Sequence, residues 1–489
     1  MTSHSSHALL GVEWRGMNTA TSVLSLLLLL YFLWRSLRQR VFLLGLPFLM
    51  DMYYSVFFDR LRPFWVLGRL ETADRMMFWF LVTWIIYFDL FLPGRRRSVR
   101  ERHLFGPRLS APEEIVLVGF VAYMLFKVAE TAVQYADLGS AISQARIPLY
   151  VFAGYFLLRG ILCHASRKET VDFVAAIVVV NTIAAVFYVL HQGLHIYIYT
   201  GMVELSYLDY GGVVLTRSFY FMPQYLPLAI AFCAAKRKWS VFWLGVLVVT
   251  LAAIWVSYTR ALILVAIVEI AVILAVRLLK RRDAWRAAKR ALQIVLVIGV
   301  FVGAAVTLMP VQSDYLFSRV AETRSRGSVL EDNNMQVRLH WWRTTYDWVG
   351  GDNRLLGVGY PSAAQDARVT RVGQMAADLV WVPTLWNLGL LGVAGLAGLF
   401  AAFAWRATSL SFASEGDAAF LSITLLGVIV GVFLLGFQEW TILDPWHTPL
   451  ALSFFTLLAA ERCRQRDEAR EAATDAGDRS AVLESVGHC

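Results

Sequence analysis

Charged residues are scarce in this chain of 489 residues: 17% are Asp, Glu, Lys or Arg, whereas 58% are hydrophobic. A soluble globular protein carries roughly a quarter charged residues. The apolar residues gather in many stretches of about 17–22, the length that crosses a bilayer as an α-helix. The shortage of charge argues against a soluble protein and predicts an all-α, polytopic transmembrane helical bundle.

Other absences exclude further classes. The four cysteines lack CxxC spacing, so neither a disulfide framework nor a zinc site is implied. The sequence has no DxD motif or His/Asp cluster suited to a metal ion, so we expect no metal and no cofactor. The net charge of +9 comes from loops between apolar stretches rather than from an aromatic-basic module, so nucleic acid is not the expected partner.

About thirteen stretches are predicted to span the membrane, or twelve if one early stretch lies at the interface. The first is predicted to be a signal anchor with an outside N-terminus, because no basic segment precedes it and "WRSLRQR" follows it. The candidate spans are residues 17–34, 41–58, 76–93, 114–135, 147–164, 171–190, 219–235, 240–257, 260–279, 291–309, 380–404, 418–437 and 446–460.

Basic loops set the expected orientation, because positive residues favour the cytoplasmic side. We predict one transmembrane domain over residues 1–460 and a charged cytoplasmic tail over 461–489. Only the basic segment 59–75 fits this orientation poorly. The loops expected to be cytoplasmic are 35–40, 94–103, 166–168, 236–238 and 277–290, and those expected to face the outside are 191–218, 310–379 and 437–446.

An arginine interrupts the apolar run 241–276, in "SYTRALIL". The run is too long for one span, so Arg260 is predicted to lie at a tight turn near the outer surface. Arg217, Arg338 and Arg343 share its side. A guanidinium matches the oxygens of a phosphate, although a single arginine can also cap a carbonyl or extend toward water. Several together favour a shared anionic site.

The large loop 310–379 contains two further signals. "VRLHWWRTTYDWV" predicts an amphipathic helix that lies on the membrane or over a cavity. Its aromatic residues can stack on sugar rings or anchor at the interface. "GGDNRLLGVGYPS" predicts a glycine-rich turn that can cradle a phosphate, but no GKS or GKT follows it, so it is not a P-loop.

Taken in order, four segments over roughly residues 210–460 resemble the O-antigen ligase and O-antigen polymerase superfamily of bacterial inner-membrane glycosyltransferases. Two aligned positions differ from the family ligases: Asp378 stands roughly where their histidine lies, and Asn387 replaces the glutamate before "GLLG". The segments are "TRSFYFMPQYLPLAI", "SYTRALILVAI", "RLHWWRTTYDWVGGDNRLLGVGY" and "LWNLGLLGVAGL".

The resemblance implies a GT-C-like, metal-independent glycosyltransferase whose donor is a glycan on undecaprenyl diphosphate, presented at the periplasmic face. The expected product is a polymerised O-antigen or exopolysaccharide repeat unit; the alternative is a ligase that transfers the glycan to lipid A core. Asp378 is the preferred base and His340 the second candidate. The candidate ligands of the diphosphate are Arg217, Arg260, Arg338 and Arg343.

Two other readings compete with an enzyme. A flippase for the same lipid-linked glycans is also polytopic and basic, but it is expected to show internal repeats, and none is visible here. A scaffold without activity does not require several outward arginines at helix ends. Both readings are less favoured than the glycosyltransferase.

Overall fold

The computed structural model confirms a polytopic helical protein. The description that follows covers residues 23–24, 26–45, 77–78, 81–87, 112–163, 165–194, 206–210, 213–217, 225–236, 240–280, 284–325, 333–351, 353–376, 380–436, 458, 461, 464–465 and 468.

The elements are almost all helices, and the described exception is one antiparallel hairpin of two short strands, β1 and β2. In chain order they are η1 (Arg40–Leu44), α5 (Pro112–Tyr135), α6 (Leu138–Leu162), α7 (Arg167–Leu194), β1 (Ser206–Tyr210), β2 (Val213–Arg217), α8 (Tyr225–Ala235), α9 (Val241–Val256), α10 (Arg260–Leu279), α11 (Ala284–Leu308), α12 (Pro310–Ser325), α13 (Asn333–Val349), α14 (Asn353–Leu356), α15 (Arg368–Ala376), α16 (Trp381–Ala413) and α17 (Gly416–Leu435).

Six of the described helices are long and apolar enough to cross a membrane: α5, α7, α10, α11, α16 and α17. The predicted span 260–279 coincides with α10, whereas α6 begins nine residues before its predicted start, capped by the Asp137 side chain. α8 has 11 residues, which as a helix reach about 16 Å, roughly half of a hydrocarbon core. Predicted spans 41–58 and 446–460 lie largely outside the described residues.

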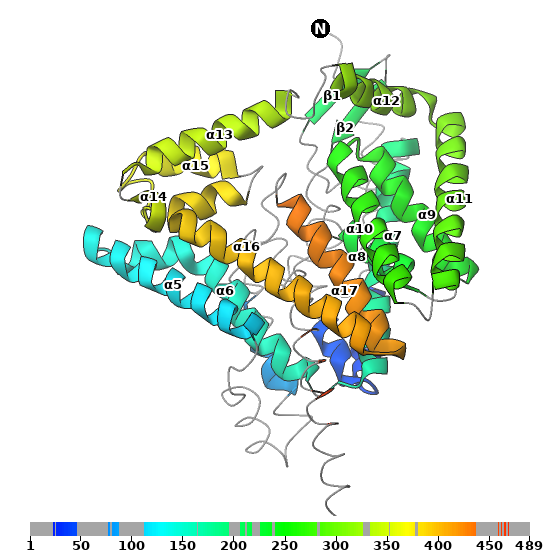
Figure 1. Ribbon diagram of the computed structural model, residues 1–489, viewed down its shortest axis with the longest axis horizontal. Helices are drawn as coiled ribbons and strands as arrows, with labels where there is room; N and C mark the ends of the chain where they lie inside the picture. Colours follow the sequence, from blue (N-terminus) through cyan, green and yellow to red (C-terminus); the bar gives the residue numbers. More distant parts are fainter. Residues whose placement is uncertain are drawn as a thin grey trace, which may run out of the picture.

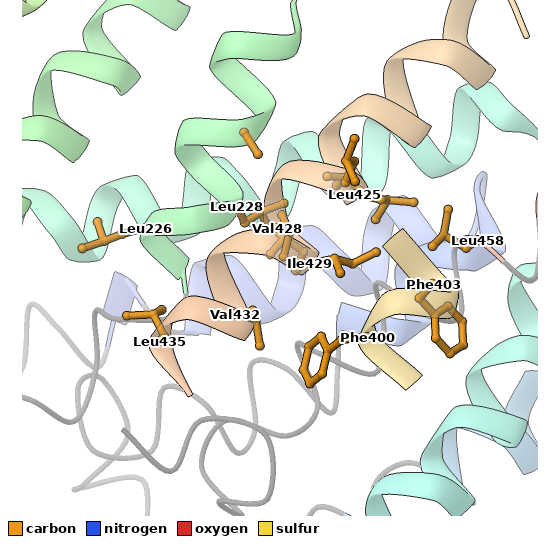
Figure 2. Close-up of a cluster of buried hydrophobic side chains, with 14 of the residues drawn as sticks. Leu226, Leu228, Phe400, Phe403, Leu425, Val428, Ile429, Val432, Leu435 and Leu458 are labelled. Atoms are coloured by element: carbon orange, nitrogen blue, oxygen red, sulfur yellow. The ribbon is translucent and has the colours of Figure 1, made fainter. Parts of the chain in front are cut away.

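Helix α17 forms the centre of the bundle, with α16 on one side and α8 and α10 on the other (Figure 1). In Figure 2, Val428 and Val432 of α17 lie between Leu228 of α8 and Phe400 of α16. Buried residues of α10 recur every three or four positions, which gives the helix one apolar face for this junction. The core thus joins the helices before the large loop to those after it.

Consecutive helices from α8 to α11 run in alternating directions, because short connections separate them. The start of α8, the α9–α10 turn and the α11–α12 turn therefore lie at one end of the bundle, together with the hairpin and α12 (Figure 1). We call this the loop end. Val380, just before α16, donates to the carbonyl of Gly436, just after α17, at 3.2 Å.

Basic side chains bind backbone carbonyls at the opposite end. Arg290 donates to the carbonyl of Cys233 at 3.1 Å, and Lys280 donates to that of Ser411 at 2.9 Å. Carbonyl groups near a helix C-terminus lack partners within their own helix, and these basic side chains donate hydrogen bonds to them. The beginning of the predicted tail also contacts the bundle here, since Arg464 donates to the hydroxyl of Thr170 at 2.7 Å. The division into a domain and a tail stays a prediction.

Candidate functional site

The glycine-rich turn of the large loop fits into a break in α16. At Gly389 the backbone of α16 has φ 64° and ψ −164°, so the helix is interrupted there. Val358 donates to the carbonyl of Trp386 at 2.8 Å, and Gly359 donates to that of Asn387 at 3.0 Å. A break exposes carbonyls that must find donors inside a membrane protein. The turn supplies those donors.

Two glycines make this approach possible. Gly357 has φ +77°, and a Cβ there would collide with the backbone nitrogens of Leu388 and Gly389. A Cβ on Gly389 would in turn collide with the backbone of Gly357. Backbone meets backbone, so no side-chain movement relieves either clash. Glycine is needed at both positions for the turn to lie in the break.

The turn does not offer its amides to a phosphate. The N–H groups of Gly357, Val358 and Gly359 donate to carbonyls of Asn353, Trp386 and Asn387, and that of Tyr360 donates to a threonine hydroxyl at 2.9 Å. An anion cradle needs N–H groups that are free to face the ligand. The amides of Gly357–Tyr360 are therefore occupied, and they do not support a phosphate cradle at this part of the turn.

Helix α13 confirms the predicted helix in the large loop and packs against α16. Trp341, Trp342 and Trp348 are half-buried and pack against the main core of the bundle. Most of their apolar surface therefore contacts protein, which leaves less of it for a sugar or the bilayer. His340 and Arg343 are exposed on the same helix.

Arg338 is half-buried on α13, and Figure 1 shows that this helix begins near the hairpin and runs away from it over α16. His340 lies 3.5 Å from the hydroxyl of Thr344 through Nε2. Arg354 of α14 stacks on the ring of Tyr346, with its guanidinium carbon 4.7 Å from the ring centroid. The contact between this cation and this ring joins α14 to α13.

The tight turn predicted around Arg260 is present. α9 ends at Val256, and Arg260 is the first residue of α10, half-buried at the loop end. Tyr258 has a left-handed φ of 53°, and its ring packs edge-on against Tyr315 of α12 at 5.6 Å between centroids. Burial raises the pKa of the Tyr258 phenol, which stays protonated. These contacts orient the start of α10 relative to α12.

The structure says less about the other two candidates, Arg217 and Asp378. Arg217 is the last residue of β2, opposite Ser206 in the hairpin register. Asp378, the preferred base, lies outside the described residues, between α15 and Val380. The structure thus sets the segments of Arg217, Arg260 and Arg338 at the loop end, while the roles of all of these residues stay predictions.

A polar junction around Arg368, the first residue of α15, was not predicted from the sequence. Its guanidinium donates to Asp366 at 2.7 Å and to the carbonyl of Trp348 at 2.8 Å, and it lies over the ring of Trp386 at 5.0 Å. These hydrogen bonds hold the pKa of Asp366 below its usual range. The spacing D-x-R was the available signal, but only the fold shows that it joins α13, α15 and α16.

A comparison with protein families matches the middle of the chain. Residues 245–397 match the family model described as O-antigen ligase. This stretch, the superfamily segment, is similar to the O-antigen ligase and polymerase superfamily and supports the predicted resemblance. It contains Arg260, Arg338, Arg343 and Asp378, whereas Arg217 precedes it. A comparison with curated proteins finds no match.

The superfamily segment begins within α9 and ends within α16, so it includes the α9–α10 turn, α13 and the break at Gly389. The match supports the predicted resemblance and a function of the O-antigen ligase or polymerase type. Among the described residues, no group of three or more His, Cys, Asp or Glu side chains is arranged to hold a metal ion. Metal independence stays a prediction.

Proposed function

We propose that this chain is a metal-independent glycosyltransferase of the bacterial inner membrane, with its active site facing the periplasm. Its donor is a glycan on undecaprenyl diphosphate, and it polymerises repeat units of a surface polysaccharide. The observation that carries the proposal is the superfamily segment itself, which spans the α9–α10 turn with Arg260 and helix α13 with Arg338.

The reaction needs a cationic environment for its leaving group. An acceptor hydroxyl attacks the anomeric carbon of the donor sugar, the bond from that carbon to the diphosphate oxygen breaks, and the lipid diphosphate leaves with the electron pair. Preorganised donors at this developing charge lower the barrier. Arg260 and Arg338 are our principal candidates, with Arg217 and Arg343 as further ligands of the same diphosphate.

A base accepts the proton of the acceptor hydroxyl. We assign this role to Asp378, because in the sequence it lies two residues before Val380, whose amide is tied to the end of α17. His340 is the second candidate, since its exposed imidazole is accessible to a substrate at the surface of α13. Either group must come within hydrogen-bond reach of the hydroxyl during the reaction.

A ligase that transfers the glycan to lipid A core is the second candidate function. The description of the matching family favours it. Asp378 and Asn387, which stand where family ligases carry a histidine and a glutamate, favour the polymerase. Both activities use the same donor, so the acceptor distinguishes them.

The test is turnover by the purified protein in nanodiscs, with an undecaprenyl-diphosphate-linked repeat unit and EDTA. A ladder of lengthened lipid-linked glycans, read by gel and mass spectrometry, is the result expected. Transfer to added lipid A core indicates a ligase instead. An absence of transfer, with movement of the lipid across proteoliposomes, identifies a transporter and overturns the proposal.

A further inference from the structure

One face of α5 contacts the glycine turn, although α5 lies outside the superfamily segment. Tyr123, Lys127 and Thr131 are four residues apart, so their side chains line up along the helix. The Tyr123 hydroxyl lies 2.8 Å from the carbonyl oxygen of Leu356 and 3.1 Å from that of Leu388. It therefore bridges the turn and the broken segment of α16.

Lys127 makes the central contact. Its side chain is only 2% exposed, and its ammonium donates to the carbonyl of Gly357 at 3.0 Å and forms an ion pair with Glu130. A buried lysine in a membrane-spanning helix is costly, and such residues usually have a specific partner. Here the partners are Glu130, whose carboxylate balances the charge, and Gly357, whose backbone lies against Gly389.

Thr131 completes the face. Its hydroxyl donates to the carbonyl of Lys127 at 2.7 Å and accepts from the amide of Tyr360 at 2.9 Å. A Cβ on Gly359 would collide with this hydroxyl, so the turn and α5 are in close contact. The turn is thus held from two sides, by α16 through backbone amides and by α5 through side chains.

We propose that Lys127 is a positioning residue for glycosyl transfer, an inference that rests on the proposed function. By holding the Gly357 carbonyl, it keeps the turn in the break of α16 and fixes the end of α13 relative to α16. α13 carries Arg338, and Asp378 leads into α16. Because misplacing reacting groups by about 1 Å can cost about 100-fold in rate, the ammonium supports catalysis without touching substrate.

The experiment compares Lys127→Met with Lys280→Met in the full-length protein in nanodiscs. Lys280 is a matched control, because it also donates to backbone carbonyls but at the opposite end of the bundle. Amide hydrogen exchange of residues 353–362 reports on the turn, and donor titrations with an undecaprenyl-diphosphate-linked repeat unit give kcat and KM. Thr131→Val and Thr131→Ser form a second pair, which removes or keeps the acceptor for Tyr360.

In Lys127→Met we expect exchange of the turn amides to rise at least tenfold and kcat to fall about 10- to 100-fold, with the donor KM within threefold of wild type. Lys280→Met should match wild type in both measurements. Thr131→Val should shift exchange in the same direction, and Thr131→Ser should restore protection. If Lys127→Met fails to fold, the threonine pair provides the same test.

The proposal is overturned if the turn amides of Lys127→Met exchange at the wild-type rate. It is also overturned if the kcat of this variant equals that of the control. A loss of activity through KM alone overturns the proposal too, because it indicates weaker donor binding rather than misplacement. If the wild-type protein transfers no glycan, the proposed function fails, and the exchange comparison alone then decides whether Lys127 holds the turn.

Discussion

Two regions of the bundle, one around α17 and the other around α16, are held together by different forces. At the junction of α8, α10 and α17 the contacts are almost entirely apolar, and the helices interlock through small and branched side chains. Around α5, α13 and α16 the decisive contacts are hydrogen bonds to backbone groups that a broken helix and a glycine turn expose. Apolar packing between membrane helices has little hydrophobic drive, so close fit matters.

The difference bears on function. A rigid apolar junction supports the start of α10 with Arg260, whereas a hydrogen-bonded assembly supports α13 with Arg338. If both arginines bind one diphosphate, the two regions supply different halves of one site. Substitutions that affect one region and spare the other test this comparison.

The largest effect is expected from the arginines. Arg260→Ala and Arg338→Ala should each lower kcat/KM for glycan transfer about 10²- to 10³-fold, because each removes a cation from the developing diphosphate charge. Arg260→Lys should also be impaired, since a point charge lacks the planar donor fork. Initial rates with a lipid-linked repeat unit give the measurement.

Arg371→Ala is the control for these variants, because Arg371 is exposed on α15 and belongs to no candidate set. It should retain the wild-type rate. Full activity in Arg260→Ala, with normal insertion, would remove the α10 side from the site and leave α13 alone as its cationic element.

A second prediction concerns the glycine turn. Gly357→Ala should lower the free energy of unfolding by about 3 kcal/mol or more, because it combines a left-handed φ with a clash against the backbone of α16. Thermal unfolding in detergent measures the loss. Gly373→Ala on α15, where a Cβ meets nothing within 4 Å, should be neutral or slightly stabilising. Equal stability of the two variants would show that the turn leaves the break.

The apolar junction was largely predictable from the sequence, because apolar stretches have the length of a membrane span and the spacing of a helix face. α10 begins and ends where the pattern predicts. The break in α16 was not predictable in the same way, since it is settled by a distant partner. Gly389 is one glycine among several in an apolar stretch, and only the approach of Gly357 interrupts the helix there.

Some residues of the candidate site were likewise predictable from the sequence, and others were not. The arginines and the helix of the large loop stood out, because charge in an outward position and aromatic residues at helical spacing are local signals. The contact between Lys127 and the turn joins residues 230 positions apart. The sequence shows Lys127 and Glu130 as a pair within one helix, but not the carbonyl that the lysine binds.

A smaller effect is expected at Glu269 of α10, a carboxyl group in the apolar junction. Its side chain is fully buried, and neither carboxyl oxygen has a hydrogen-bond partner within the part of the chain that the structure describes. A Cβ on Gly431 of α17 would collide with it and lie 3.0 Å from Pro227. Gly431→Ala should therefore lower the free energy of unfolding by about 1–3 kcal/mol.

A double-mutant cycle sharpens this prediction. Glu269→Ala makes room for the added methyl group, so Gly431→Ala should cost about 1 kcal/mol less in that background. Gly398→Ala on α16 is the control, because a Cβ there meets nothing within 4 Å. Additive costs in the cycle would mean that the carboxyl rotates away freely and that the junction is less tightly packed than the distances indicate.

The smallest effect is expected at the polar junction of α15. Asp366→Asn should lower the free energy of unfolding at pH 7 by less than about 1 kcal/mol, because the Arg368 side chain is 47% exposed and water screens the pair. Hydrogen bonds from Arg368 lower the pKa of Asp366 in the folded state, so this contribution is present above the unfolded pKa of about 3.9. It is lost as the pH falls through the lower folded pKa. The difference in unfolding temperature between wild type and variant should therefore shrink from pH 7 toward pH 3. A constant difference would assign the effect to the shape of the side chain rather than to its charge.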